Sequence, residues 1–161
     1  MKILTIVRHG KSSWNHDVND LDRPLKKRGI VDVIRVSKEY VSLGLIPETV
    51  FSSPAKRAIE TCNIFLNSKE FSYIKVKVFQ QLYDFAGNNL INFVKSIDDK
   101  YQHVMIFGHN YAMTNFVNTY GDVFIDNLPT SGLAVFEFDI EHWKDLKHGK
   151  TITLLLPKDL R

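Results

Sequence analysis

Short apolar runs alternate along the whole chain with longer stretches in which apolar residues recur every three to four positions. The short runs are rich in β-branched and aromatic residues, as buried strands are. They predict strands at residues 3–7, 49–52, 74–79 and 104–107, and a closing antiparallel pair at 133–138 and 151–156.

The longer stretches between these runs have the spacing of helices with one apolar face. Ile30, Val33, Ile34 and Val41 line the first of them, which is expected to end at Gly44, a residue that commonly stops helices. The same spacing recurs at residues 58–66, where Pro54 precedes the helix, and again at 90–97 and 113–120.

Strands that alternate with helices in this way favour an α/β fold, with a mostly parallel sheet covered by helices on both faces. No repeat, low-complexity tract or Pro/Gly/Ser-rich linker interrupts the pattern, so we predict a single domain over residues 1–161. In such sheets ligands bind beyond the carboxyl ends of the strands.

Composition narrows the class of protein. The 161 residues are 44% hydrophobic, which is enough for one domain with its own core. A single cysteine, Cys62, excludes an internal disulfide and is typical of a reducing compartment, and no run is long enough for a signal peptide or a membrane span. We therefore expect a cytoplasmic protein, without a membrane partner, and a monomer.

The net charge is +3, and the basic residues are scattered among 18 acidic ones. Nucleic-acid-binding proteins have clustered basic residues or a recognisable module, and neither is present. The small excess of positive charge fits an anionic substrate. His16, His103, His142 and His148 fit no metal-ligand spacing, and we expect them on the surface.

Three polar segments directly follow predicted strands. They are Arg8-His9-Gly10-Lys11-Ser12-Ser13-Trp14-Asn15, Ser52-Ser53-Pro54-Ala55-Lys56-Arg57-Ala58 and Gly108-His109-Asn110. Because the carboxyl ends of parallel strands lie at one edge of a sheet, two histidines and two arginines should converge there.

Such a group suits phosphoryl transfer. The planar forks of Arg8 and Arg57 can each donate two parallel hydrogen bonds to a phosphate. His9 is the candidate nucleophile, since a neutral imidazole can attack phosphorus near pH 7 without a metal. His109, cationic when phosphate is bound, would stabilise the charge on its oxygens.

Further residues could assist at the same edge. Gly10 and Gly108 would let the backbone turn and approach a ligand closely. Asn15 and Ser53 would add neutral donors, and the helix N-terminus near Asn110 would offer free N–H groups to an anion.

These motifs resemble those of the histidine phosphatase superfamily, the phosphoglycerate-mutase-like enzymes, and most of all the small SixA-type phosphohistidine phosphatases. The similarity covers nearly the whole chain. The segments that carry it are Arg8-His9-Gly10, Lys11-Ser12-Ser13-Trp14, Asp22-Arg23-Pro24-Leu25 with Arg28-Gly29, Ser52-Ser53-Pro54-Ala55 with Arg57 and Thr61, Leu82-Tyr83, Gly108-His109-Asn110, Leu128-Pro129 and Trp143.

The resemblance implies a three-layer α/β/α sandwich and a phosphohistidine intermediate on His9. It implies phosphate binding by Arg8, Arg57 and His109, with Asn15 as a neutral ligand, and no metal or other cofactor. Larger relatives place a Glu after the third strand. Here Asp84 is the one nearby carboxylate, and so the candidate proton donor.

The lack of a clear proton donor bears on the substrate. An alkoxide leaving a phosphate ester is strongly basic and needs a proton, whereas a histidine nitrogen, with a conjugate-acid pKa of about 6.5, leaves with little help. The short chain also lacks room for a lid. We therefore predict a phosphatase for phosphohistidine on another protein.

Alternatives remain at the level of sequence. They are a general phosphomonoesterase acting on small phosphorylated substrates, a mutase, and a catalytically silent phosphate-binding module. Arg23 and Arg28 have equal claims to contact phosphate or a partner and to form structural ion pairs. Trp14 and Trp143 are expected to be packing groups in the core or at its edges rather than recognition platforms, and Cys62 is expected to be a small core residue. Tyr111 stands where relatives have proline, so substrate preference could differ.

Overall fold

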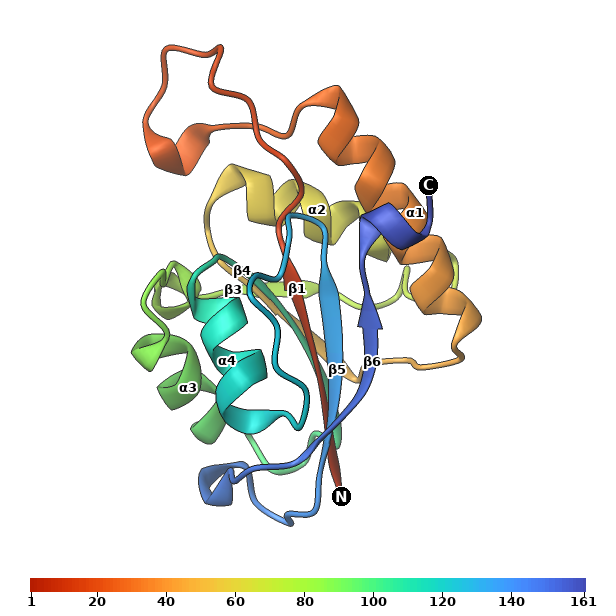
Figure 1. The fold of residues 1–161 in the computed structure, drawn as a ribbon, viewed down its shortest axis with the longest axis vertical. Coiled ribbons are helices and arrows are strands. Elements are labelled where there is room, and N and C mark those ends of the chain that lie inside the picture. The colour runs from red at the N-terminus through yellow and green to blue at the C-terminus, as the bar shows by residue number, and fades with distance from the viewer.

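A computed structural model describes residues 1–161 as one six-stranded sheet with helices on both faces (Figure 1). The strand order is β3-β2-β4-β1-β5-β6. The first four strands along the chain are parallel to one another, β5 runs antiparallel to β1, and β6 runs antiparallel to β5. The strands are β1 (Lys2–Arg8), β2 (Thr49–Ser52), β3 (Val76–Val78), β4 (His103–Gly108), β5 (Leu133–Phe138) and β6 (Lys150–Leu155).

All six predicted strands are present, and the mostly parallel α/β arrangement is confirmed. The largest difference is in β3, which is shorter than the predicted 74–79. This strand lies at the edge of the sheet and pairs only with β2, through three residues. Because β3 has a partner strand on one side only, fewer hydrogen bonds hold its ends, and the strand is shorter than predicted.

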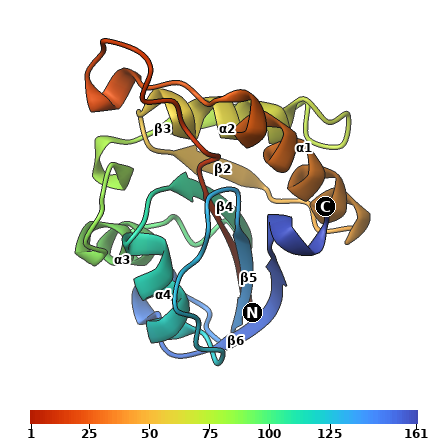
Figure 2. The ribbon, with the colours of Figure 1, turned by 45° about the horizontal axis from the view of Figure 1, so that its top comes forward.

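Four α-helices cover the sheet: α1 (Lys27–Ser42), α2 (Lys56–Leu66), α3 (Asn88–Lys95) and α4 (Ala112–Tyr120). Figure 2 shows α1 and α2 on one face and α3 and α4 on the other. The structure is therefore the three-layer α/β/α sandwich expected from the sequence. None of the helices has the length and apolar character needed to cross a membrane.

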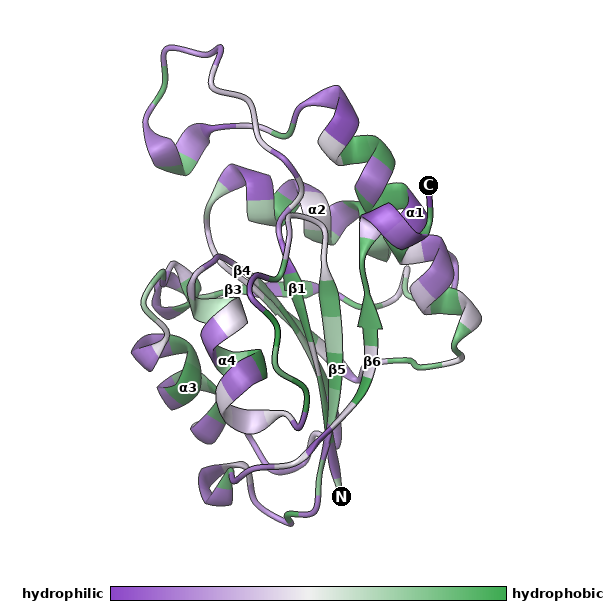
Figure 3. Cartoon of the chain, viewed as in Figure 1, coloured by the Kyte–Doolittle hydropathy of each residue, from purple (hydrophilic) through white to green (hydrophobic).

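Two hydrophobic clusters hold the layers together, one on each face of the sheet. Along β4, Val104 and Ile106 belong to the cluster beneath α3 and α4, while Met105 and Phe107 belong to the cluster beneath α1 and α2. Successive side chains of a strand point to opposite faces, so a strand buried on both sides must be apolar throughout. Figure 3 shows this hydrophobic character along the strands.

Two details of the helix and surface predictions are wrong. Of the predicted apolar face, Val33 is buried, but Ile30 and Ile34 are each 38% exposed, because α1 turns Val36 and Tyr40 toward the sheet beside Val33. His103 is buried in β4 and not on the surface; its Nε2 lies 3.1 Å from the Thr5 hydroxyl and 3.2 Å from that of Tyr40.

Candidate functional site

The two histidines of the predicted site lie next to each other beyond neighbouring strands. Arg8 and Gly108, the last residues of β1 and β4, are paired in the register of the two strands. The residues that follow them, His9 and His109, are therefore neighbours. The backbone N–H of His9 donates to the Gly108 carbonyl at 3.1 Å, and the two imidazole centroids are 5.2 Å apart. The parallel topology therefore brings together residues separated by a hundred positions.

His9 is held as a neutral ring with one nitrogen free. Its Nδ1 lies 2.7 Å from the Gly10 carbonyl, and because a carbonyl only accepts, Nδ1 must carry the proton. Burial lowers the pKa of His9 to about 3, which the Gly10 bond opposes and the charges of Arg57 and Arg8 reinforce. At neutral pH the Nε2 lone pair is therefore available for attack.

His109 is also buried, and one of its nitrogens lacks a partner. Its Nε2 lies 2.8 Å from the Ser53 hydroxyl, which also accepts from the Ala55 N–H, while its Nδ1 has no hydrogen bond. The rings of Tyr83 and Phe85 pack against it. Burial lowers the pKa of His109 to about 2, helped by the charges of His9 and Arg57. A bound phosphate dianion would favour the cationic ring.

Unpartnered polar atoms gather at this edge of the sheet. The buried side-chain atoms without a hydrogen-bond partner are Arg8 Nε, Arg57 Nε, His109 Nδ1 and Ser131 Oγ. A buried donor left unpaired costs about 1–3 kcal/mol, so proteins rarely tolerate several in one place. Three nitrogens of predicted site residues that share this property indicate a binding site for an anion.

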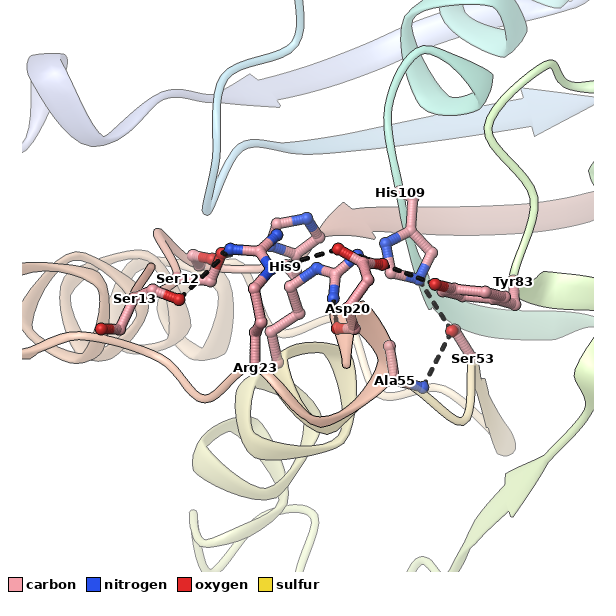
Figure 4. A network of polar contacts seen from close by, with 11 residues as sticks. His9, Ser12, Ser13, Asp20, Arg23, Ser53, Ala55, Tyr83 and His109 are labelled. Carbon is pink, nitrogen blue, oxygen red and sulfur yellow. Dashed lines mark hydrogen bonds and ion pairs between the residues drawn. The ribbon is translucent and has the colours of Figure 1, made fainter. Parts of the chain in front are cut away.

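Asp20, which the sequence analysis did not single out, closes one side of the site. Its carboxylate pairs with Arg57 at 2.9 Å and with Arg23 at 3.1 Å, and it accepts from the Tyr83 hydroxyl (Figure 4). Burial alone would raise the pKa of Asp20, but the hydrogen bonds from Tyr83, Arg57 and Arg23 outweigh it and hold that pKa well below its usual value. Asp20 therefore stays ionised.

His9, Asp20 and Arg57 line an open cleft of 560 Å³, whereas His109 is not among its lining residues. Five of the lining residues are Arg or Lys, and Asp20 is the only carboxylate among them. The lining residues are Arg8, His9, Lys11, Ser12, Trp14, Asp20, Arg23, Lys26, Arg57, Phe85, Asn110 and Thr130. The positive charge and the unpaired donors together suit a phosphate group.

Trp14 and Arg23 form the outer wall of the cleft. Trp14, which was expected to be a packing group, is 77% exposed, and the centre of its ring lies 3.5 Å from the Arg23 guanidinium carbon. The guanidinium therefore stacks on the face of the ring, as cations commonly do with tryptophan. Trp143 and Cys62, by contrast, are buried as expected.

Ser131 is a second residue that the sequence analysis missed. It has φ of 66°, a backbone conformation that side chains other than glycine adopt only at a cost of about 1–3 kcal/mol. Its N–H donates to the His9 carbonyl at 3.0 Å, and the neighbouring Gly132 carbonyl accepts from the Arg8 N–H. The strained turn before β5 thus fixes the backbone of both site residues.

The structure does not bring Asp84 into the cleft. Its Oδ2 accepts hydrogen bonds from the backbone N–H groups of Gly87 and Leu90, at the start of α3. The carboxylate is therefore committed to the helix N-terminus, where such groups are ordinarily found. This placement corrects the expectation that Asp84 stands ready as a proton donor.

Three of the predicted phosphate ligands are engaged elsewhere or lie outside the cleft. The Gly10 N–H donates to the Thr61 hydroxyl, and a Cβ at Gly10 would lie 2.8 Å from a Val33 methyl, so this glycine permits close packing on α1. Asn110 lines the cleft, but its amide bonds Thr114 and Asn127. Asn15 is exposed and is not among the lining residues.

Comparison with known proteins shows the family of the chain. Residues 4–88 match the model of the histidine phosphatase superfamily (branch 1). An uncharacterized chloroplastic protein of Arabidopsis thaliana is 31% identical over 116 residues, 66% of this chain and 53% of the relative. The 2,3-bisphosphoglycerate-dependent phosphoglycerate mutase of a Hydrogenobaculum species is 33% identical over 47% of this chain and 32% of the enzyme. The chain thus spans about half or less of these relatives.

Solved structures share the fold over nearly the whole chain. The putative phosphohistidine phosphatase SixA from Agrobacterium tumefaciens has a TM-score of 0.81 at 23% identity, covering 97% of this chain and 98% of its own. The protein histidine phosphatase SixA complexed with tungstate has a TM-score of 0.81 at 17% identity, covering 99% of each chain. Phosphoglycerate mutase from Bacillus anthracis has a TM-score of 0.64 at 15% identity, covering 88% and 93%.

Proposed function

We propose that this chain, which belongs to the histidine phosphatase superfamily, is a phosphatase that removes the phosphoryl group from phosphohistidine on another protein. The observation that carries the proposal is the free Nε2 of a neutral His9 beside three buried nitrogens that lack partners. A nucleophile within a set of unpaired donors is the arrangement that phosphoryl transfer through a covalent intermediate requires.

The reaction would take two steps on His9. In the first, Nε2 attacks phosphorus and the bond between phosphorus and the substrate nitrogen breaks. The substrate leaves as neutral imidazole, because its other ring nitrogen takes a proton from solvent. In the second, water attacks phosphorus, the bond to Nε2 breaks, inorganic phosphate departs, and the proton lost by water passes to solvent.

The hydrogen bond between His9 and Gly10 would assist the second step. Nδ1 already carries a proton and donates it to the Gly10 carbonyl at 2.7 Å. Phosphorylation of Nε2 therefore gives a cationic ring, and the bond to phosphorus breaks to leave neutral imidazole with no further proton. The same carbonyl that orients the nucleophile would thus prepare it as a leaving group.

The proton-donor chemistry of the cleft favours a P–N substrate. Asp20 is the only lining carboxylate, its pKa is held well below the usual range, and Asp84 is bound to α3. An ester oxygen would leave as a strong base with no acid to protonate it, whereas a histidine nitrogen would not need one. Structural likeness to proteins titled phosphohistidine phosphatase supports the same substrate class.

The decisive experiment compares two substrates. Phosphate release is measured at pH 7 with a chelator present, from a histidine-phosphorylated carrier protein and from a phosphoserine peptide. We expect the carrier to be hydrolysed at least 100-fold faster, on the order of the effect of one general acid. Equal rates would show that an acid is available, and the protein would then be a general phosphomonoesterase.

His9→Ala provides the blank for that assay and tests the intermediate. We expect it to lose acid-labile phosphate labelling and to lower kcat on the order of 10⁴-fold or more, because no other group takes over a covalent nucleophile. His148→Ala is the matched control, since His148 is exposed and makes no hydrogen bond. Full labelling of the His9 variant would overturn the assignment of the nucleophile.

A further inference from the structure

A second, smaller cleft adjoins the first. It has a volume of 220 Å³ and lies between the start of α1 and the last residues of the chain, where Figure 1 places the C-terminus beside α1. Lys11 and Thr130 line both clefts, so the two are neighbours. No hydrophobic side chain lines the second cleft, and its residues are Lys11, Arg28, Asp32, Pro129, Thr130, Pro157, Lys158 and Arg161.

Most of the cations in this cleft have no counter-charge. Asp32, which is buried, pairs with Arg161 at 2.8 Å and with Arg35 at 3.5 Å. Lys11, Arg28 and Lys158 are exposed and make no ion pair in the structure. Three unpaired positive charges therefore face solvent next to the phosphate cleft.

The placement of Arg28 is locally unfavourable. Lys26 caps α1, and Lys27 and Arg28 occupy its first turn, which contains no acidic residue. The N-terminus of a helix carries partial positive charge, so cations there cost a few tenths of a kcal/mol each. Sequences that break a local rule in this way commonly do so for function.

The charge of the chain is concentrated at the two clefts. Together their linings contain eight of the 21 Lys and Arg residues but only two of the 18 acidic ones, Asp20 and Asp32. The rest of the chain thus has 13 basic and 16 acidic residues, a net negative charge. A molecule that is weakly basic overall therefore has one strongly basic face.

We propose that the second cleft binds acidic side chains of the protein substrate while the phosphohistidine enters the first cleft. The inference rests on the function proposed above. Arg28 and Lys158 can pair with carboxylates of the partner, Arg28 through two parallel hydrogen bonds. None of the residues with unpaired buried polar atoms lines the second cleft, whereas Arg8 and Arg57 line the first, so the second is suited to surface carboxylates rather than to a tightly held phosphate.

Charge reversal separates this contact from catalysis. Arg28→Glu with Lys158→Glu should raise KM for a histidine-phosphorylated acidic carrier about 10-fold or more, leaving kcat unchanged, because complementary charges act mainly on encounter and binding. Hydrolysis of phosphoramidate, a small P–N substrate, should not change. The matched control is Lys144→Glu with Lys147→Glu, which makes the same charge change at exposed, unpaired lysines beyond the opposite edge of the sheet.

The outcomes distinguish the two proposals. If the wild type hydrolyses neither the carrier nor phosphoramidate, the phosphatase proposal fails. If the wild type hydrolyses both substrates, the double variant of Arg28 and Lys158 tests the second cleft alone. That proposal fails if the variant has unchanged KM values for both substrates, if both KM values rise equally, or if the control variant gives the same result. Binding of the unphosphorylated carrier to the His9→Ala protein gives a readout without turnover. The affinity should fall with added salt and with the charge reversal. An affinity that changes with neither would overturn the inference.

Discussion

The two ends of the parallel strands, called here the two edges of the sheet, differ in their buried polar groups: at one edge these groups have hydrogen-bond partners, and at the other several do not. At the amino ends of the parallel strands, Lys2 is almost fully buried, yet its Nζ donates to the carbonyls of Asp99 at 2.7 Å and Tyr101 at 3.0 Å. His103 in the same region bonds Thr5 and Tyr40. At the carboxyl ends, Arg57 is equally buried, but its Nε has no partner.

The difference shows where the chain is complete by itself and where it is not. Satisfied buried polar groups stabilise a fold, whereas unsatisfied ones destabilise it unless another molecule supplies the missing partners. The concentration of unpaired nitrogens at one edge therefore distinguishes a binding site from a polar core. Mutation, ligand addition and pH should each act differently on the two edges.

The largest effect is expected from Arg57→Ala. Arg57 spans the site, with Nη1 and Nη2 on Asp20 and Nε free. Loss of one charged donor to the transferring phosphoryl group should lower kcat/KM about 10²–10³-fold, as removal of a transition-state donor does elsewhere. The melting temperature should fall by only a few degrees, because the free protein already leaves this residue partly unsatisfied.

Lys2→Met is the counterpart at the other edge. It removes a buried ammonium together with two hydrogen bonds to carbonyls, so stability should fall while kcat/KM stays the same. Steady-state kinetics and thermal melts of both variants test the comparison. An Arg57 variant with normal activity would remove that residue from the site.

Ligand addition should come next in size. Inorganic phosphate or tungstate supplies acceptors to Arg8, Arg57 and His109, so saturation to 100 times Kd should add about 2.7 kcal/mol to the free energy of unfolding. The same addition to the Arg57→Ala protein should give a much smaller gain, whereas the Lys2→Met protein should keep the full gain. Equal stabilisation of all three proteins would indicate a non-specific effect of the anion.

The same contrast explains what the sequence could and could not predict. The strands, and the helices on both faces of the sheet, were predictable because a strand buried on both faces must be apolar throughout. The parallel pairing of β1 and β4 then places His9 and His109 together. Arg8 and Arg57 follow from the same rule, since each lies at or just beyond a strand end.

The residues that were missed or misplaced depend on irregular segments. Asp20 lies in the long loop between β1 and α1, in one turn of 3-10 helix at Asp20–Asp22, and it reaches Arg57 and Tyr83 across 37 and 63 positions. Hydrophobic spacing does not indicate such contacts. Trp14 lies in the same loop and is exposed, and Asp84 turns toward α3 because two backbone N–H groups there lack other partners. Side-chain direction in a loop is set by these tertiary hydrogen bonds rather than by local sequence.

The smallest effect, on the pH dependence of stability, compares the two edges directly. Burial lowers the pKa of His103 to about 4, against the opposing effect of Glu48, and burial lowers the pKa of His109 to about 2. Below pH 6.5 the unfolded chain binds protons at these residues and the folded chain does not. The free energy of unfolding should therefore be highest above pH 6.5 and should fall as pH drops toward 4.

Each histidine contributes at most about 1.4 kcal/mol per pH unit to the slope of the free energy of unfolding against pH. Because each substitution removes one such contribution, His103→Gln and His109→Gln should each make the slope shallower. Phosphate should separate them. Because a bound anion favours the cationic forms of His109 and His9, added phosphate should also reduce the slope in wild type and in His103→Gln, and should reduce it less in His109→Gln, where only His9 can respond. Denaturant titrations between pH 4.5 and 7.5, with and without phosphate, measure this. If phosphate altered the slope equally in both variants, His109 would not be the residue that responds to the anion.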